Sequence, residues 1–360
     1  MIYKKLLFTP GPLNCPMKIK KKMLLDVGSR DYNFSKTIKN VRKNILKFGN
    51  APENEYSSIL IPGSGTYAIE STLSSIIGKN QKLGLLINGS YGKRMLEIAN
   101  IHRIKTECIY LPENKSFNIN HLKKFSSNIS HIAMVHCETT TGILNNINSI
   151  GNFFKNNDKT FIVDAMSSFG GIPIDIKKNN IDYLISSSNK CLHGPPGLSF
   201  CIANKKNLLN NRHNSKTLSL DLRKQYDYFE EYNQFRFTPP THIVNALNES
   251  LIDLESIGGV KERNNNYMKN NKLIKKNLLN LGFRNYELEL NSNIISTWYY
   301  PEKNFDFEHF YKFMEKNNII IYPGKLINEN VFRIGNIGDL NEDDILYFIH
   351  IMKKYQSNYS

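Results

Sequence analysis

The sequence predicts an α/β protein in which a large domain, built on a mostly parallel and doubly wound sheet, precedes a smaller α+β domain. Between residues 57 and 187, short runs rich in Ile, Val, Phe and Tyr alternate with segments of helical spacing, which is the pattern of strands and covering helices in such a sheet. The 360 residues exceed what one hydrophobic core usually contains. We therefore expect an N-terminal arm at residues 1–20, a large domain at 21–245 and a small domain at 246–360, entered through a bridging helix.

The chain begins with an arm, LLFTPGPLNCP, whose three prolines and one glycine favour an extended path across another surface. A helical pattern then runs from Pro16 to Lys47 and breaks at residues 27–33. Arg30, in that break, is able to meet an anion, but we favour simple exposure to solvent.

The first predicted strand of the large domain, Ser57–Ile61, turns through a glycine-rich segment into a helix. This turn presents backbone N–H groups, the hydroxyls of Ser64 and Thr66, and the positive end of a helix dipole, which together form a phosphate-binding arrangement. The segment GSGTYA also matches the dinucleotide pattern G-x-G-x-x-G/A. The acid expected about twenty residues later is missing, since Asn88 and Gly89 stand there, so a mononucleotide or a single phosphate ester fits better.

Four further polar positions follow predicted strands or open predicted helices. Because ligand groups in such a sheet come from the carboxyl ends of its strands, we expect them beside the phosphate turn. They are Tyr91, Thr139, Asp164 and Lys190. Taken alone, Asp164 and Lys190 are equally well explained as a turn cap and a solvated amine, but the full set favours a shared site.

This set of groups is what pyridoxal 5′-phosphate requires. Lys190 would form the Schiff base and move a proton, and Asp164 would keep the pyridine nitrogen protonated. Tyr91 would stack on the ring, and Thr139 would bond its phenolic oxygen. His136 and His193 are close in sequence, but packing explains them equally well and neither is given a catalytic role.

Composition argues against several other classes of protein. A net charge of +15 and a pI near 9.4 permit binding to nucleic acid or membranes, but the lysines are mixed with asparagines along the chain rather than gathered in one patch. The densest cluster, Lys18–Lys22, is interleaved with apolar residues as on a solvated helix face. The five cysteines show neither paired nor zinc-binding spacing, and no apolar run approaches the roughly eighteen residues of a membrane span. We expect a cytoplasmic protein without a metal, nucleic-acid partner or membrane partner.

Eight motifs resemble the 2-aminoethylphosphonate:pyruvate aminotransferase family, which belongs to the class V aminotransferases of fold type I. The likeness extends along nearly the whole chain. The motifs are LFTPGPL, GSGTYAIE, HIAMVHCETTTG, IVDAMSSFGGIPIDI, IDYLISSSNKC, RFTPPTH, IIIYPGK and FRIGNIG.

The resemblance implies a role for each matching residue and a homodimer with shared active sites. Lys190 and Asp164 would keep the roles given above, and Arg333 would bind the acid group of the substrates, 2-aminoethylphosphonate and pyruvate, unless it forms only a surface salt bridge. The implied cofactor-binding residues are Ser64, Gly65, Thr66, Tyr91, Thr139, Asp164, Met166, Asn189 and Lys190, with Thr238 and Thr241 contributed by the other subunit. From the residues alone, RFTPPTH reads only as a strand that enters a proline-bounded loop.

Two segments depart from the family pattern, and they concern the choice of amino donor rather than the cofactor. Residues 29–33 replace a longer acidic stretch, and His193 and Pro195 stand where Gln and Val are common. We expect both segments near the substrate entrance. An alanine:glyoxylate or serine:pyruvate type of aminotransferase is therefore the alternative within the family, and a dinucleotide-dependent oxidoreductase or a binding protein is the alternative outside it.

Overall fold

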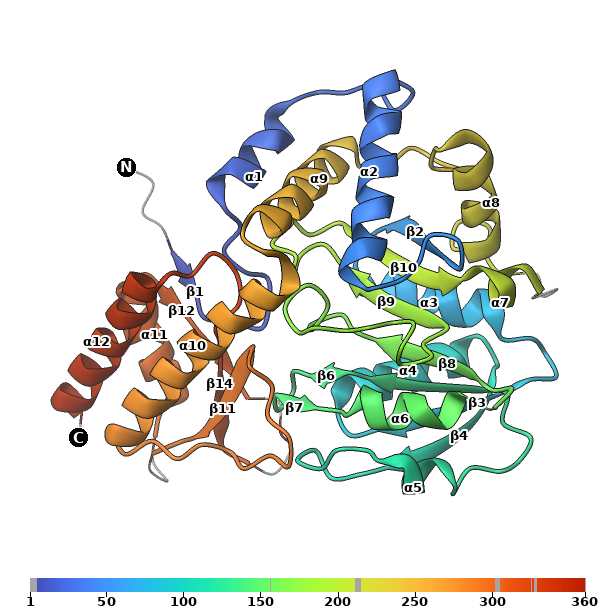
Figure 1. Ribbon diagram of the computed structural model, residues 1–360. Helices are drawn as coiled ribbons and strands as arrows, with labels where there is room; N and C mark the ends of the chain where they lie inside the picture. The colour runs from blue at the N-terminus through green and yellow to red at the C-terminus, as the bar shows by residue number, and fades with distance from the viewer. Residues whose placement is uncertain are drawn as a thin grey trace.

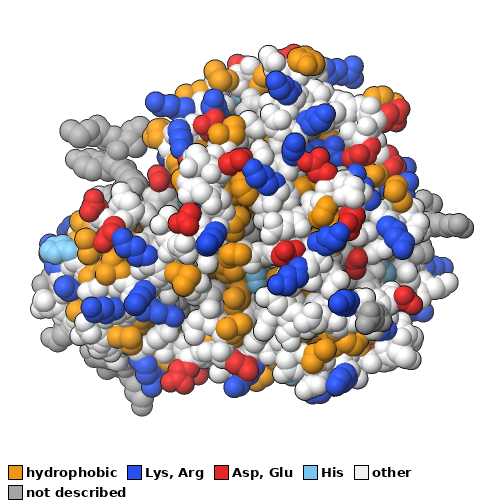
Figure 2. Space-filling view, viewed as in Figure 1, with side chains coloured by type: hydrophobic (Ala, Val, Ile, Leu, Met, Phe, Trp, Pro, Cys, Tyr) orange, Lys and Arg blue, Asp and Glu red, His pale blue; other side chains and the backbone are white. Residues whose placement is uncertain are grey.

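The computed structural model describes residues 5–155, 157–210, 215–301, 305–324, 326 and 329–359. Figure 1 shows a larger part built around one sheet and a smaller part, formed by the C-terminal orange and red elements, beside it. No helix of the described residues is both long and apolar enough to cross a membrane. On the face drawn in Figure 2, Lys and Arg side chains are scattered among Asp and Glu rather than gathered in one patch.

Seven strands form the central sheet in the part of the chain that the structure describes. Their order is β2 (Tyr56–Pro62), β10 (Leu198–Asn204), β9 (Tyr183–Ser187), β8 (Thr160–Asp164), β5 (His131–Val135), β3 (Lys82–Ile87) and β4 (Lys105–Tyr110). Only β10 runs antiparallel to its neighbours, β2 and β9, while the other pairs are parallel. The prediction of a mostly parallel α/β sheet is therefore confirmed.

Helices accompany this sheet because each has an apolar stripe to bury. In α2, for example, Phe34, Ile38, Val41 and Ile45 recur at helical spacing and are all buried. The helices before residue 257 are α1 (Met17–Lys21), a short 3-10 turn (Lys22–Leu24), α2 (Tyr32–Phe48), α3 (Gly65–Ile76), α4 (Ser90–Ile101), α5 (Ile119–Leu122), α6 (Ile147–Phe154), α7 (Lys205–Asn210), α8 (Leu222–Tyr232) and α9 (Thr241–Ser256). A short hairpin, β6 (Cys137–Glu138) with β7 (Ile143–Leu144), follows β5.

The smaller part has its own sheet and its own hydrophobic core. Its antiparallel strands are ordered β11 (Ile295–Tyr299), β14 (Val331–Gly335) and β13 (Tyr322–Pro323). Its helices are α10 (Gly259–Asn280), α11 (Phe307–Lys316) and α12 (Glu342–Tyr359). Trp298, Phe310, Phe332 and Phe348 fill its core, which is separate from the core of the larger part.

The boundary predicted between residues 245 and 246 falls inside α9. The buried residues of this helix, including Val244, Leu247 and Leu251, belong to the core of the larger part, and α10 supplies Ile274 and Leu278 to the other core. The boundary itself stays a prediction.

The N-terminal arm attaches to the smaller part. Its strand β1 (Leu6–Leu7) pairs in parallel with β12 (Ile319–Ile320), and Phe8 is buried in the C-terminal core. The arm then crosses back to α1 beside the larger part (Figure 1).

Three sequence expectations need correction or extension. The strand predicted at RFTPPTH is wrong, because residues 235–240 form no strand and α9 begins at Thr241. Strand β4 escaped notice because its residues are mostly polar and partly exposed. The sequence predicts a helix at LIKKNLLNLG, but α10 begins earlier, at Gly259; its first half, KERNNNYMKNN, is too polar to show helical periodicity in the sequence.

Candidate active site

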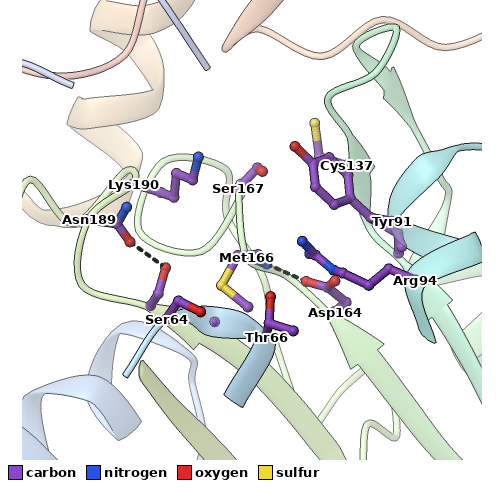
Figure 3. Close-up of a pocket in the computed structure, with 13 residues that line it drawn as sticks. Ser64, Thr66, Tyr91, Arg94, Cys137, Asp164, Met166, Ser167, Asn189 and Lys190 are labelled. Carbon is purple, nitrogen blue, oxygen red and sulfur yellow. Dashed lines mark hydrogen bonds between the residues drawn. The ribbon is translucent and has the colours of Figure 1, made fainter. Parts of the chain in front are cut away.

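One pocket of about 180 Å³ lies at the carboxyl ends of β5, β8 and β9. Figure 3 shows its lining side chains converging from these strand ends and from the starts of α3 and α4. Of the residues proposed from the sequence, it brings together Ser64, Gly65, Thr66, Tyr91, Asp164, Met166, Asn189 and Lys190.

The start of α3 forms the floor of the pocket. Ser64 caps this helix but its hydroxyl does not bond the helix backbone, so the oxygen is available to a ligand. A side chain at Gly65 would place a Cβ 2.1 Å from the sulfur of Met166, which means that only glycine lets Met166 and the helix start line the same space. Backbone N–H groups, two hydroxyls and the helix dipole thus face the pocket, as an anion requires.

Asp164 ends β8 and points into the pocket (Figure 3). The residue is 1% exposed, and its Oδ1 accepts a hydrogen bond of 2.9 Å from the backbone N–H of Met166. Burial raises the pKa of this carboxyl, while the Met166 N–H and the charges of Arg94 and Lys190 act in the opposite direction. A cation in the pocket, such as a protonated ring nitrogen, would further favour the ionised form.

Lys190 follows β9 and lies across the pocket from Asp164. Its Nζ donates a hydrogen bond of 2.7 Å to the backbone carbonyl of Pro10 in the N-terminal arm. The preceding residue, Asn189, accepts a hydrogen bond of 2.9 Å from the hydroxyl of Ser187. The arm therefore does lie across another surface, as expected, and that surface includes the lysine.

Sequence reasoning did not assign Arg94, which lines the pocket, or Glu138, which lies behind the lining and supports it. Arg94 lines the pocket, and its Cζ lies 4.8 Å from the centre of the Tyr91 ring. Its Nε is buried without a partner among the described residues. The spacing of three residues from Tyr91 on the same helix was a usable signal, because residues i and i+3 share a helix face.

Glu138 fixes two elements of the site against each other. Its Oε2 accepts from the backbone N–H of Tyr91 at 2.9 Å, and its Oε1 accepts from the hydroxyl of Thr140 at 2.6 Å. The residue is fully buried, and burial raises its pKa to about 7. A Cβ at Gly89 would lie 2.1 Å from the Glu138 side chain, which explains why a glycine precedes α4.

Thr139 and Arg333 lie beside the pocket rather than in its lining. The Thr139 hydroxyl is buried and has no hydrogen-bond partner within the described residues, and the Thr139 carbonyl accepts from Nη1 of Arg333 at 3.0 Å. Arg333 is 2% exposed and also donates from Nε to the carbonyl of Pro323 at 2.9 Å. Burial lowers its pKa, and the alternative of a surface salt bridge is wrong because the side chain is buried.

Thr238 and Thr241 do not line this pocket. Thr238 is exposed and lines a separate cavity of about 710 Å³, together with Arg30 and Arg236. Thr241 begins α9 and is half-buried. Their contribution across a subunit interface stays a prediction.

Neither histidine close in sequence contributes to the pocket. His136 is buried, with Nδ1 2.8 Å from the hydroxyl of Ser168, and burial lowers its pKa to about 4. His193 is also buried, and its Nε2 lies 2.5 Å from the hydroxyl of Tyr267 on α10. His193 and Arg30 each line another cavity of this chain, and their expected place near the substrate entrance stays a prediction.

The described residues fit pyridoxal 5′-phosphate. The open helix start of α3 suits its phosphate, the carboxylate of Asp164 suits a protonated ring nitrogen, and Lys190 supplies an amine. The buried Thr139 hydroxyl lacks a hydrogen bond, and a ring oxygen would provide one. No cluster of metal-binding side chains is found among the described residues.

Comparisons with known proteins agree with this geometry. The family model described as aminotransferase class V matches residues 22–337. A 2-aminoethylphosphonate–pyruvate transaminase from Lysinibacillus sphaericus (strain C3-41) is 41% identical over 353 residues, which cover 97% of this chain and 96% of that protein.

Two solved structures share the fold. Alanine–glyoxylate aminotransferase from Nostoc sp. has a TM-score of 0.91 and 21% identity, and the match covers 98% of this chain and 96% of that one. Phosphoserine aminotransferase from Trichomonas vaginalis, described with PLP bound, has a TM-score of 0.80 and 17% identity over 96% of this chain and 99% of that one. These neighbours confirm the predicted fold type I architecture, and with the family they imply pyridoxal phosphate as the cofactor.

Proposed function

We propose that this chain, which belongs to the class V aminotransferase family, transfers the amino group of 2-aminoethylphosphonate to pyruvate with pyridoxal 5′-phosphate as cofactor. The products are phosphonoacetaldehyde and L-alanine. The observation that carries the proposal is the pocket in which an anion-binding helix start, Asp164 and Lys190 meet. The substrate pair is supported by the 41% identical relative that bears this activity in its name.

The protein residues have separable tasks in this reaction. When bound, pyridoxal phosphate would supply a ring that accepts electrons released from the substrate carbon. Lys190 would hold the cofactor through Nζ and, once released, carry a proton to and from the substrate carbon. Asp164 would accept a hydrogen bond from the protonated ring nitrogen. Tyr91 and Met166 would lie against the two faces of the ring, with Ser64, Gly65, Thr66 and Asn189 at the phosphate and Thr139 at the phenolic oxygen.

Arg333 would bind the acid group of each substrate in turn. A guanidinium has five donors in a planar fork, which matches a carboxylate and a phosphonate alike. Two of its N–H groups already bond the carbonyls of Pro323 and Thr139, so the side chain is held beside the pocket before any substrate arrives. Because the side chain is already held in place, binding a substrate costs less conformational entropy.

A homodimer would complete the site. Thr238 and Thr241 lie outside the pocket of their own chain, as expected if they reach the phosphate site of a second subunit. We also propose that the enzyme works in the cytoplasm, because all five cysteines lack disulfide partners, as is usual in a reducing compartment.

The test is the amino-donor profile of the purified protein loaded with pyridoxal phosphate. Alanine formation from pyruvate is measured with 2-aminoethylphosphonate, glycine, serine and taurine, and alanine with glyoxylate is assayed in parallel. We expect kcat/KM to be highest with 2-aminoethylphosphonate by about 100-fold or more, because a buried site matched to one polar group rejects analogues that leave it unpaired. A preference for an amino acid would move the chain to the alanine:glyoxylate or serine:pyruvate type. A protein that binds no pyridoxal phosphate would contradict the cofactor itself.

A further inference from the structure

The N-terminal arm contacts the amine of Lys190. The Pro10 carbonyl accepts a hydrogen bond of 2.7 Å from Nζ, and the next residue, Gly11, has a φ of +118°. A Cβ at Gly11 would lie 2.2 Å from Nζ and less than 3 Å from the last two carbons of the Lys190 side chain. The lysine amine therefore occupies the space that a side chain at residue 11 would take.

The position of the Pro10 carbonyl is fixed by contacts on both sides. The Phe8 carbonyl accepts from the backbone N–H of Gly335 at 3.0 Å, and the Thr9 hydroxyl donates to the Pro12 carbonyl at 2.5 Å. Further along, the Asn14 carbonyl accepts from the Asp339 N–H at 2.8 Å. A side chain at Gly335 would lie 2.3 Å from the Thr9 carbonyl, so the arm rests directly on the strand that carries Arg333.

We propose that the Pro10 carbonyl is the fixed acceptor for the Lys190 amine whenever that amine is not bonded to the cofactor. Residue 11 is glycine because any side chain there would keep the amine from the Pro10 carbonyl. The inference rests on the proposed function, in which Lys190 bonds the cofactor. On exchange with the substrate, the substrate nitrogen would take over the double bond from Nζ to the cofactor, and its two hydrogens would pass to Nζ, which would leave as a neutral amine. The carbonyl gives that released amine one orientation from which to transfer a proton and to bond the cofactor again.

Pro10 and Gly11 are thus positioning residues that act through Lys190. An ammonium group has three N–H donors and a freely rotating stem, so an amine without a fixed acceptor would sample many positions. Holding a reacting group in one place raises the rate of its reaction. If the arm had only a structural role, changes in it would alter folding and total cofactor binding. They would not selectively slow the formation of the covalent bond between Nζ and the cofactor.

The test compares Gly11→Ala with two matched glycine variants. At Gly282 the φ is also positive, +79°, but an added Cβ meets nothing within 4 Å, so Gly282→Ala reports backbone strain alone. At Gly338 the φ is +96° and an added Cβ contacts Leu13 and Asn14 of the arm at 3.0 Å, so Gly338→Ala reports crowding of the arm away from Lys190.

The measured quantity is the rate at which pyridoxal phosphate becomes covalently attached to Lys190 in cofactor-free protein, without substrate. Samples are reduced with borohydride at successive times and the modified peptide is quantified by mass spectrometry, while equilibrium dialysis gives total cofactor bound. We expect Gly11→Ala to attach the cofactor about 10-fold to 100-fold more slowly than wild type, the loss expected for a hydrogen bond to a charged group. Total binding and melting temperature should match those of Gly282→Ala, and Gly338→Ala should attach the cofactor at nearly the wild-type rate.

Attachment in Gly11→Ala at the wild-type rate, or equal slowing in all three variants, would overturn the inference. If Gly11→Ala does not fold, Thr9→Val decides, because it removes the hydroxyl that braces the Pro10 segment without placing an atom at Lys190. Slower attachment in Thr9→Val supports the inference, and unchanged attachment overturns it. Wild-type protein that never attaches the cofactor would contradict the proposed function and the inference with it, whereas a different donor profile leaves the inference standing.

Discussion

The cofactor pocket and the Arg333 region are built on different principles. The pocket lies where strands end and helices begin, so one edge of one sheet brings Ser64, Tyr91, Asp164 and Lys190 together. Arg333 instead belongs to the smaller part, and its bond to the Thr139 carbonyl spans 194 residues of sequence. Local motifs at strand ends thus supply the residues that would act on the cofactor. Contacts between the larger and smaller parts position the Arg333 guanidinium, which would select the substrates.

The two regions also treat buried charge differently. In the pocket and behind its lining, burial raises the pKa of Asp164 and of Glu138, and N–H donors support the two carboxyl groups. At Arg333, burial lowers the pKa and backbone carbonyls support the cation. We therefore expect pocket variants to change turnover and cofactor spectra, and Arg333 variants to change substrate affinity.

The largest effect is expected at Lys190. Lys190→Ala removes the amine that would bond the cofactor and carry the proton, so alanine formation should fall by about 10³-fold or more. The visible absorbance of the bound cofactor should shift as its covalent bond is lost. Lys93→Ala, at an exposed position of α4, is the control and should keep wild-type activity. Equal activity in the two variants would remove Lys190 from the mechanism.

Asp164→Asn should have the next largest effect. The amide keeps the size of the side chain and an oxygen for the Met166 N–H, but it loses the negative charge that stabilises a protonated ring nitrogen. We expect kcat for alanine formation to fall by about 10²-fold, with little change in the KM for pyruvate. A change confined to the KM for pyruvate would show that Asp164 acts in substrate binding, as proposed for Arg333, rather than at the cofactor.

Arg94→Gln should produce a smaller effect, visible mainly in the pH profile. The charge of Arg94 opposes the rise that burial causes in the pKa of Asp164, so its removal should raise that pKa further. Because Asp164 is useful only when ionised, the acid limb of the kcat profile should move to higher pH, with about a 10-fold loss of activity below the new limb. Profiles between about pH 5 and pH 9 check this, and a limb that stays in place or moves to lower pH would contradict it.

Glu138→Gln is expected to alter the pH dependence of stability more than activity. Burial raises the Glu138 pKa from 4.5 to about 7, so the folded protein holds this proton more tightly than the unfolded chain. That contribution is complete below about pH 4.5 and is lost as the pH rises through about 7, a change of roughly 3 kcal/mol. Glutamine cannot lose a proton, so the difference in urea unfolding between variant and wild type should change over this range. Parallel stability curves would show that Glu138 does not titrate there.

The sequence predicted the site residues that depend on nearby residues and missed those that depend on distant contacts. The strand-end rule placed Ser64, Asp164 and Lys190 correctly in one pocket because each position depends on residues a few places away. It did not find Glu138, whose role depends on Tyr91 47 residues earlier, or Pro10, which meets Lys190 across 180 residues. Strand β4 and the polar half of α10 were also missed, because their packing rather than their own apolar pattern determines their structure.

The central claim is that the sheet-edge pocket holds the cofactor while Arg333 holds the acid group of the substrate. The most direct measurement adds 2-aminoethylphosphonate to pyridoxal phosphate-loaded wild type and Arg333→Gln, and follows the cofactor absorbance against donor concentration. The account predicts the same starting spectrum and the same final spectral change in both proteins, with a half-saturating concentration about 10-fold to 100-fold higher in the variant, as expected for loss of a charge-assisted hydrogen bond. An unchanged half-saturating concentration, or loss of the cofactor itself from Arg333→Gln, would contradict it.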